Sequence, residues 1–159
     1  MRALETRRRG PITRADWMRA GLEAFARWQA PQLVLEVDGE RVDGAFGQVL
    51  VSNIVHYAGF AVLDRGRRLD DGLFEVYAFE CRSRARLARH LLHGVLGRFP
   101  AAGVTMRRAR RVVVTCETPV PFEIDGDFRG RTPFELAVGS QPFRILVPSD
   151  APATGARTR

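Results

Sequence analysis

Two short acidic turns contain the residues of this sequence that could do chemistry. The first is the LDDGL segment at 69–73 and the second is the IDGD segment at 124–127, and each adjoins a run of β-forming residues. A carboxylate in such a turn can accept a proton or bind a hard cation such as Mg²⁺. An Asp-Gly pair between β segments is by default a hairpin turn, because glycine accepts a positive φ and aspartate caps the turn. Both interpretations stay open for these turns, whereas a third pair, Asp38-Gly39, is interpreted as purely structural.

The standard enzyme signatures are absent from the sequence. It contains no GxxxxGK[ST] loop, no GxGxxG, no GxSxG, no HExxH and no paired CxxC. The three histidines, His56, His90 and His93, have no evident acid or nucleophile partner, so each is interpreted as a surface or interface residue. The sequence therefore gives no support for a stand-alone hydrolase of a familiar type. Cys81 and Cys116 have no metal-ligand spacing and are expected to be reduced, part-buried small hydrophobes.

Positive charge is concentrated in one segment. The formal net charge is +7 and all 25 basic residues are arginines. Nine of them, and no acidic residue, lie between Cys81 and Cys116, so the rest of the chain is slightly acidic. Such a local field favours an anionic partner, either a membrane or a nucleic acid, and a solvated arginine face is an equal alternative. Single-stranded nucleic acids need aromatic stacking platforms, which this stretch lacks, so we expect no nucleic acid partner.

The hydrophobic patterning predicts a mainly β fold. A length of 159 residues predicts one domain. Helices are expected at about 15–28, after a capping-box-like start at Thr13, and at 83–97. Strands are expected at 33–37, 46–53, 73–80, 112–117, 121–124, 134–138 and 143–148. These elements predict an antiparallel β-sandwich with an N-terminal helix and one amphipathic helix packed on it.

The expected helix at 83–97 is basic and amphipathic. Leu87, Leu91, Leu92, Val95 and Leu96 fall on one half of its helical wheel, and arginines fall on the other half. Such a helix can lie on an anionic membrane or pack on a sheet. Packing on the sheet is the expected outcome, because the apolar half has no Trp or Phe anchor.

The two ends of the chain differ in composition from its centre. We expect residues 1–13 to be flexible, 14–148 to form the domain and 149–159 to be a disordered tail. The sequence has no run of about 18 uncharged apolar residues and no apolar segment behind its basic N-terminus. A cytoplasmic location is therefore expected, with peripheral contact at the inner face of the membrane as a further expectation.

The order of the segments resembles the C-terminal domain of the diacylglycerol kinase-like lipid kinases, which include sphingosine and ceramide kinases. The resemblance covers about residues 14–148 and depends on the spacing of the whole set rather than on one motif. The segments that carry it are VSN at 51–53, YAGF at 57–60, LDDGLFEV at 69–76, RARRVVV at 108–114, PVPFEIDGD at 119–127 and FRILVP at 143–148.

This resemblance implies roles for the two acidic turns. Asp125 matches the proposed general base of the family, which would take the proton of a lipid hydroxyl during phosphoryl transfer. Asp127 stands where the family has a glutamate that contacts nucleotide or Mg²⁺. Asp71, with the carbonyl oxygens of Arg68 and Leu73, matches a structural Mg²⁺ site of bacterial members.

The same resemblance implies an ATP-dependent lipid kinase that acts on a lipid such as diacylglycerol. No GGDGT-like loop is present in the sequence, so ATP is expected to bind to a separate nucleotide-binding domain or partner chain. The chain is then a fragment, half of a split enzyme, or a domain that has lost catalysis. The alternative function is a non-catalytic lipid- or membrane-binding β-sandwich.

Overall fold

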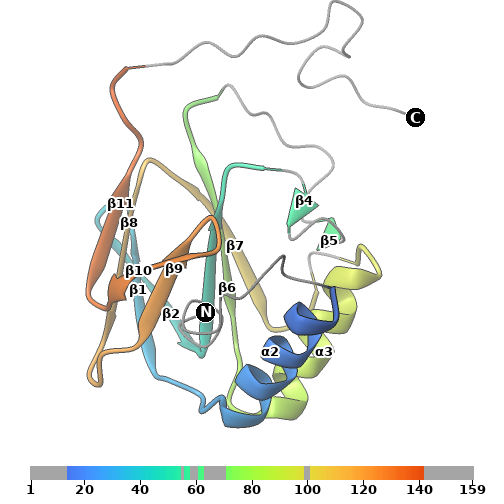
Figure 1. The fold of residues 1–159 in the computed structure, drawn as a ribbon. Coiled ribbons are helices and arrows are strands. Elements are labelled where there is room, and N and C mark those ends of the chain that lie inside the picture. Colours follow the sequence, from blue (N-terminus) through green and yellow to red (C-terminus); the bar gives the residue numbers. More distant parts are fainter. Residues whose placement is uncertain (1–13, 55, 58–60, 63–70, 99–100, 142–159) are drawn as a thin grey trace, which may run out of the picture.

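The computed structural model describes residues 14–54, 56–57, 61–62, 71–98 and 101–141. Eleven strands and two helices lie within these residues (Figure 1). The helices are α2 (Arg14–Arg27) and α3 (Arg84–Val95). The strands are β1 (Leu33–Val37), β2 (Glu40–Phe46), β3 (Gln48–Ser52), β4 (His56–Tyr57), β5 (Ala61–Val62), β6 (Phe74–Phe79), β7 (Val104–Ala109), β8 (Arg111–Cys116), β9 (Pro121–Ile124), β10 (Asp127–Arg131) and β11 (Phe134–Ala137). The expected strand at 143–148, the expected flexible ends and part of the YAGF turn lie outside the described residues.

Two antiparallel sheets form the body of the molecule, as the sequence predicts. Sheet A has the strand order β11-β8-β1-β2, and sheet B has the order β3-β6-β7. β9 and β10 form a separate hairpin, and β4 pairs with β5. Apolar residues from the facing sides of sheets A and B form one core, which makes the architecture a β-sandwich. The most buried of these residues are Leu35, Ala78, Ala109 and Val112, each with no measurable exposure.

Strand β6 is buried on both of its faces. Val76 and Ala78 point into the core of the sandwich, whereas Tyr77 and Phe79 belong to a second apolar cluster with Trp28. This second cluster lies between sheet B and the two helices, which cover the outer face of sheet B (Figure 1). The molecule therefore has three layers: sheet A, sheet B and the helix pair. Among the described helices, none is long and apolar enough to cross a membrane.

The chain crosses from sheet A to sheet B at Gly47. The Gly47 N–H donates to the carbonyl oxygen of Phe79 at 3.0 Å, which brings the backbone close to β6. A Cβ atom at this position would clash with the carbonyl oxygen of Cys81. Gly47 therefore divides the expected strand at 46–53 into the end of β2 and the whole of β3, since no side chain fits at the corner.

The chain returns from sheet B to sheet A at Arg110, between β7 and β8. The N–H groups of Arg110 and Arg111 donate to the same carboxylate oxygen of Asp38, at 2.9 and 2.8 Å. Asp38 and Gly39 form the two-residue loop of the β1–β2 hairpin, with φ values of 50° and 88°. The structural interpretation of this turn is confirmed, and its carboxylate also holds the corner between the sheets.

Five strands were not expected from the sequence: the two-residue strands β4 and β5, and the longer strands β2, β7 and β10. Each of the longer three carries two or three charged residues, as in ERVDGAF, VTMRRA and DFRGR. These charged side chains interrupt the alternation of apolar and polar residues that predicts a half-buried strand, so the sequence pattern of these strands is weak. Pairing with β1, β6 and β9 respectively holds them in place instead.

Helix α3 packs on sheet B through a different side from the one expected. Its buried residues are His90 and Gly94, and Leu87 also contacts the apolar cluster. These three positions lie on one narrow stripe of the helix. Gly94 has no side chain, and the His90 ring lies edge-on against Phe79 with 5.5 Å between ring centroids, so the stripe comes close to sheet B. The expectation that the leucine-rich half packs on the sheet is therefore wrong for most of that half. Leu91, Leu92, Val95 and Leu96 are 50–56% exposed.

Candidate functional site

The second acidic turn is the tip of the β9–β10 hairpin. Ile124 pairs with Asp127, which leaves Asp125 and Gly126 as a two-residue loop with φ values of 52° and 87°. Positive φ at both positions is typical of the type I′ turns that connect such hairpins. Asp125 and Asp127 are both exposed. Within the described part of the chain, the Asp125 carboxylate makes no hydrogen bond or ion pair.

Contacts at the base of this hairpin fix its position. The Val120 N–H donates to Thr132 Oγ1 at 3.0 Å, and the Thr132 N–H donates to the Val120 carbonyl oxygen at 2.9 Å. Thr132 is buried, and the rings of Phe122 and Phe134 stack with 4.5 Å between centroids. The hairpin is therefore anchored to sheet A, and it presents an exposed carboxylate at its end.

The first acidic turn stands at the start of β6. Asp71 Oδ1 accepts a hydrogen bond from the Leu73 N–H at 3.0 Å, and the residue is half-buried. Gly72 has a φ of 67°, and the Arg110 guanidinium lies about 4 Å from the point where a Gly72 Cβ would stand. The turn therefore lies beside the corner that Asp38 holds. Arg68, the third residue of the expected metal site, lies outside the described residues.

The chemistry of the first turn fits a magnesium ion. The hydrogen bond from Leu73 occupies one oxygen of the Asp71 carboxylate, and the other oxygen has no partner in the described residues. A carboxylate and a backbone carbonyl are hard oxygen donors, and Mg²⁺ commonly uses one or two carboxylates together with water. A cluster of three or more acidic, histidine or cysteine ligands does not occur in the described ranges. Any cation here would therefore keep much of its water shell.

The structure brings the expected residues together as two pairs. Asp71 and Leu73 are joined by their hydrogen bond, and Asp125 and Asp127 flank one glycine. In the described part of the chain, no hydrogen bond or ion pair links one pair to the other.

A buried carboxylate that was not expected lies close to the first turn. Glu75 is 2% exposed, and its two oxygens have different partners. Tyr77 donates its hydroxyl to Oε2 at 2.7 Å, and Arg108 Nη2 lies 3.3 Å from Oε1. The signal in the sequence was a lone acidic residue inside the β-forming run FEVYAF. A charged group in such a run has to be paired once it is buried.

The family of the chain follows from a match over nearly its whole length. Residues 2–147 match the family described as the YegS C-terminal NAD kinase beta sandwich-like domain. The chain belongs to this family. The match confirms the resemblance to the C-terminal domain of the diacylglycerol kinase-like lipid kinases.

Two bacterial relatives are similar to this YegS C-terminal domain at 24% identity. One is a diacylglycerol kinase of Staphylococcus saprophyticus, aligned over 131 residues, which are 82% of this chain and 43% of the relative. The other is a diacylglycerol kinase of Staphylococcus carnosus, aligned over 135 residues, which are 84% of this chain and 44% of the relative. The chain thus spans less than half the length of both relatives.

The fold is also similar to a solved structure of a diacylglycerol kinase from Bacillus anthracis str. Sterne. The TM-score is 0.53 at 16% sequence identity, and the similarity covers 73% of this chain and 43% of that one. At this identity the comparison supports the sandwich fold of the YegS C-terminal domain.

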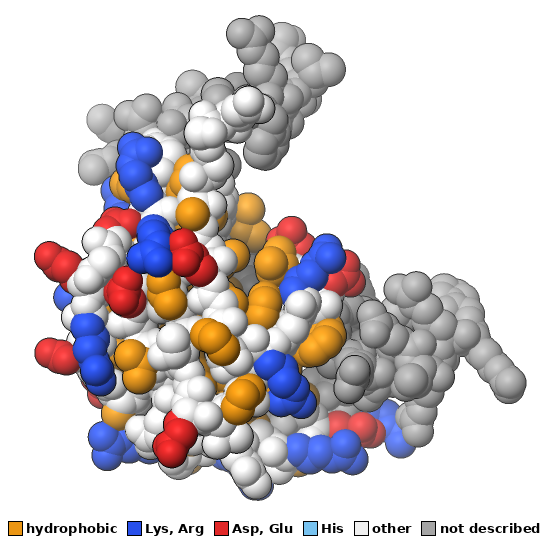
Figure 2. All heavy atoms as spheres, turned by 90° about the vertical axis from the view of Figure 1, so that its left-hand side faces the viewer, with side chains coloured by type: hydrophobic (Ala, Val, Ile, Leu, Met, Phe, Trp, Pro, Cys, Tyr) orange, Lys and Arg blue, Asp and Glu red, His pale blue; other side chains and the backbone are white. Residues whose placement is uncertain are grey.

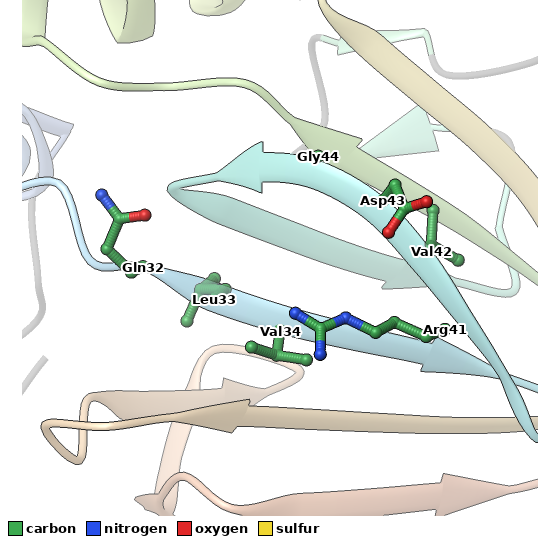
Figure 3. Close-up of a pocket in the computed structure, with 7 residues that line it drawn as sticks. All are labelled: Gln32, Leu33, Val34, Arg41, Val42, Asp43 and Gly44. Carbon is green, nitrogen blue, oxygen red and sulfur yellow. The ribbon is translucent and has the colours of Figure 1, made fainter.

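A shallow hollow lies between β1 and β2 of this domain (Figure 3). It forms where the register shifts, because Leu33 pairs with Phe46 whereas Leu35 pairs with Val42. Its volume of about 130 Å³ is well below the roughly 300–1,000 Å³ typical of small-molecule sites. The hollow therefore does not suit the body of a lipid.

The outer face of sheet A carries interspersed acidic and basic side chains (Figure 2). Arg111 bridges Glu135 at 2.7 Å and Glu36 at 3.1 Å across three neighbouring strands. The hydrogen bond and the charge of Arg111 lower the pKa of Glu135, and the same contacts raise the pKa of Arg111. This mixed charge distinguishes the face from the arginine-rich helix layer on the other side of the domain.

Proposed function

We propose that this chain is the lipid-binding and general-base part of an ATP-dependent lipid kinase. The observation that supports the proposal most directly is the carboxylate of Asp125, which is exposed at the tip of an anchored hairpin and has no partner among the described residues. A general base needs a carboxylate that a substrate hydroxyl can reach, rather than one already engaged in a structural bond. Asp38, whose oxygen accepts two backbone N–H groups, does not meet this condition.

In the proposed reaction, Asp125 accepts the proton of a lipid hydroxyl as the phosphoryl group of ATP is transferred to that oxygen. The two staphylococcal relatives are diacylglycerol kinases, which suggests diacylglycerol as the acceptor. Asp127, two residues along the same hairpin, would contact the nucleotide or its metal. Asp71, with the carbonyl oxygens of Leu73 and Arg68, would hold a structural Mg²⁺ ion.

A nucleotide-binding domain, on a partner chain or elsewhere in a longer protein, completes this proposal. The relatives are more than twice as long as the aligned part, which leaves room for such a domain in those proteins. Because the acceptor is a lipid, the proposal includes a cytoplasmic location with peripheral contact at an anionic membrane.

Reconstitution tests the catalytic role of Asp125. The chain is mixed with the nucleotide-binding domain of a diacylglycerol kinase, radiolabelled ATP and a panel of lipids that includes diacylglycerol. Asp125→Asn should lower the rate of phosphate transfer by about 10²–10⁴-fold, the usual contribution of a general base. Stability should change little, because asparagine tolerates the same positive φ and caps the turn similarly.

Glu123→Gln is the matched control, since Glu123 is an exposed carboxylate on the same hairpin. This variant should keep the wild-type rate. A folded Asp125→Asn variant with near-normal turnover would exclude Asp125 as the base, and an unfolded one would make it structural. If no lipid is phosphorylated while lipid binding persists, the alternative of a non-catalytic lipid-binding module is favoured.

A further inference from the structure

The outward face of α3 is apolar although it is in contact with water. Leu91, Leu92, Val95 and Leu96, here called the leucine face, are 50–56% exposed. The helix is attached to sheet B by its opposite stripe, in which His90 and Gly94 are buried. Four aliphatic side chains on one half of one helix are thus exposed together, and a large exposed apolar patch is typical of a surface that has a partner.

Exposed arginines accompany the leucine face on the same helix. Those on or next to the helix are all exposed, and they are Arg82, Arg84, Arg86, Arg89 and Arg98. The first turn of α3 has no acidic residue, and no acidic residue occurs anywhere between Cys81 and Cys116. The arginine side chains therefore have no acid on their own helix to neutralise them.

The neighbouring helix adds to the same layer. Arg84 Nε donates to the Trp28 carbonyl oxygen at 3.3 Å, so the start of α3 lies close to the residue that follows α2. On α2, Met18 and Leu22 are 69% and 67% exposed. The helix layer as a whole thus exposes more large apolar side chains than the described residues of sheet A, where Val34 is 37% exposed.

We infer that the leucine face docks on an anionic lipid bilayer, with α3 lying flat in the headgroup region. The aliphatic side chains would enter the boundary between headgroups and acyl chains, and the flanking arginines would bind lipid phosphates. A nucleic acid would neutralise the arginines but would leave the leucines in water, so the combination favours lipid. At 12 residues, the helix is about 18 Å long and suits the membrane surface rather than a span.

Vesicle flotation tests this inference on the full chain, without ATP, so its result does not depend on the catalytic role of Asp125. The probes are vesicles of phosphatidylcholine alone and vesicles with phosphatidylglycerol added. The wild-type chain should bind the anionic vesicles and bind the neutral ones much more weakly. The double variant Leu92→Gln/Leu96→Gln should bind the anionic vesicles at least about tenfold more weakly, because two leucine side chains that would be partly buried in the bilayer are replaced by polar ones.

Removal of positive charge is the second arm of the test. Arg86→Gln/Arg89→Gln should weaken binding by about fivefold for each arginine that reaches the surface. Arg41→Gln, an exposed arginine on β2, is the control and should bind like the wild type. All variants should keep the wild-type melting temperature, because the replaced side chains are exposed.

Three outcomes would overturn the inference. Equal binding to neutral and anionic vesicles would exclude the role of the arginines. If Leu92→Gln/Leu96→Gln binds anionic vesicles like the wild type, the attachment is electrostatic and the leucine face does not insert. If the wild-type chain does not bind vesicles but forms a dimer, and Leu92→Gln/Leu96→Gln dissociates that dimer, the leucine face is an interface between two copies of the chain.

Discussion

Three aspartates precede a glycine in the described turns, and their carboxylates differ in what they bind. Asp38 and Asp125 adopt nearly the same positive φ, yet Asp38 accepts two backbone N–H groups and Asp125 accepts none from the described residues. The turn conformation was predictable from the Asp-Gly pairs, because it depends on two adjacent residues. The partner of Asp38 was not, because Arg110 lies 72 positions away in the sequence.

Replacement of Asp38 should destabilise the fold. Asp38→Ala removes the acceptor of two N–H groups and places alanine at a positive φ, so we expect a loss of about 2 kcal/mol in the free energy of unfolding. Asp38→Asn should lose less than half of that, because its amide oxygen can still accept and asparagine tolerates the conformation. Urea unfolding measures both. Asp43→Ala, at an exposed position on β2, should stay within about 0.5 kcal/mol of wild type.

The first acidic turn gives a second prediction at this scale. If Asp71 helps to hold Mg²⁺, the ion should raise the melting temperature, by the equivalent of about 2.7 kcal/mol at 100 times its Kd. Asp71→Asn should abolish this dependence while the oxygen that accepts from Leu73 is kept. Thermal unfolding in Mg²⁺ and in EDTA compares the two proteins. A wild-type melting temperature that EDTA leaves unchanged would mean that the turn is only structural.

At the scale of elements, apolar patterning predicted the strands that are buried and missed those that are charged. β1 occurs at the predicted 33–37, and β6 lies within the predicted 73–80. β7 was not predicted, because the adjacent Arg107 and Arg108 interrupt the alternation of apolar and polar residues. All six of its residues nevertheless pair with β6. The existence of α3 was also predictable, but its orientation was not. The side that is buried is the one with Gly94 and with the contact between His90 and Phe79. A helical wheel places residues by their angle around the helix axis and does not show such contacts with a distant strand.

The corner at Gly47 is the element-scale feature most sensitive to substitution. Gly47→Ala should lower the free energy of unfolding by about 1–3 kcal/mol, because the added methyl group would clash with the Cys81 carbonyl oxygen, a backbone atom. Gly21→Ala, in the middle of α2 with open space around it, is the control and should stabilise by about 0.5–1 kcal/mol. Denaturant titration checks both signs. An unchanged Gly47→Ala variant would show that β2 and β3 can shift at the corner without cost.

At the scale of the whole molecule, the stability of the domain should depend on pH in two separate ranges. Burial lowers the pKa of His90 below its ordinary 6.5, so the unfolded chain binds a proton more readily. The contribution of neutral His90 to the free energy of unfolding is therefore fully present above about pH 6.5 and falls as the pH drops below that value. Arg111 lowers the pKa of Glu135 below its ordinary 4.5, so that contribution is lost only at more acidic pH.

Melting temperatures measured from pH 7.5 to 3.5 test this dependence. We expect a first decrease that begins below about pH 6.5 and that His90→Leu reduces, and a second that begins below about pH 4.5 and that Glu135→Gln reduces. If His90→Leu leaves the first decrease unchanged, a group other than His90 causes it.

The strand order of sheet A has a consequence for the way the protein is made. β1 pairs on one side with β2, its neighbour in sequence, and on the other with β8, which follows some 80 residues later. As the chain leaves the ribosome, the β1–β2 hairpin and all of sheet B are synthesised before β8. One edge of β1 therefore stays unpaired, and Leu35 and Val37 lack their neighbours Val114 and Val112, until residues 111–116 emerge and add β8. Any interruption of synthesis before that point would leave an open strand edge and an apolar surface, the two features that most readily cause nascent chains to aggregate.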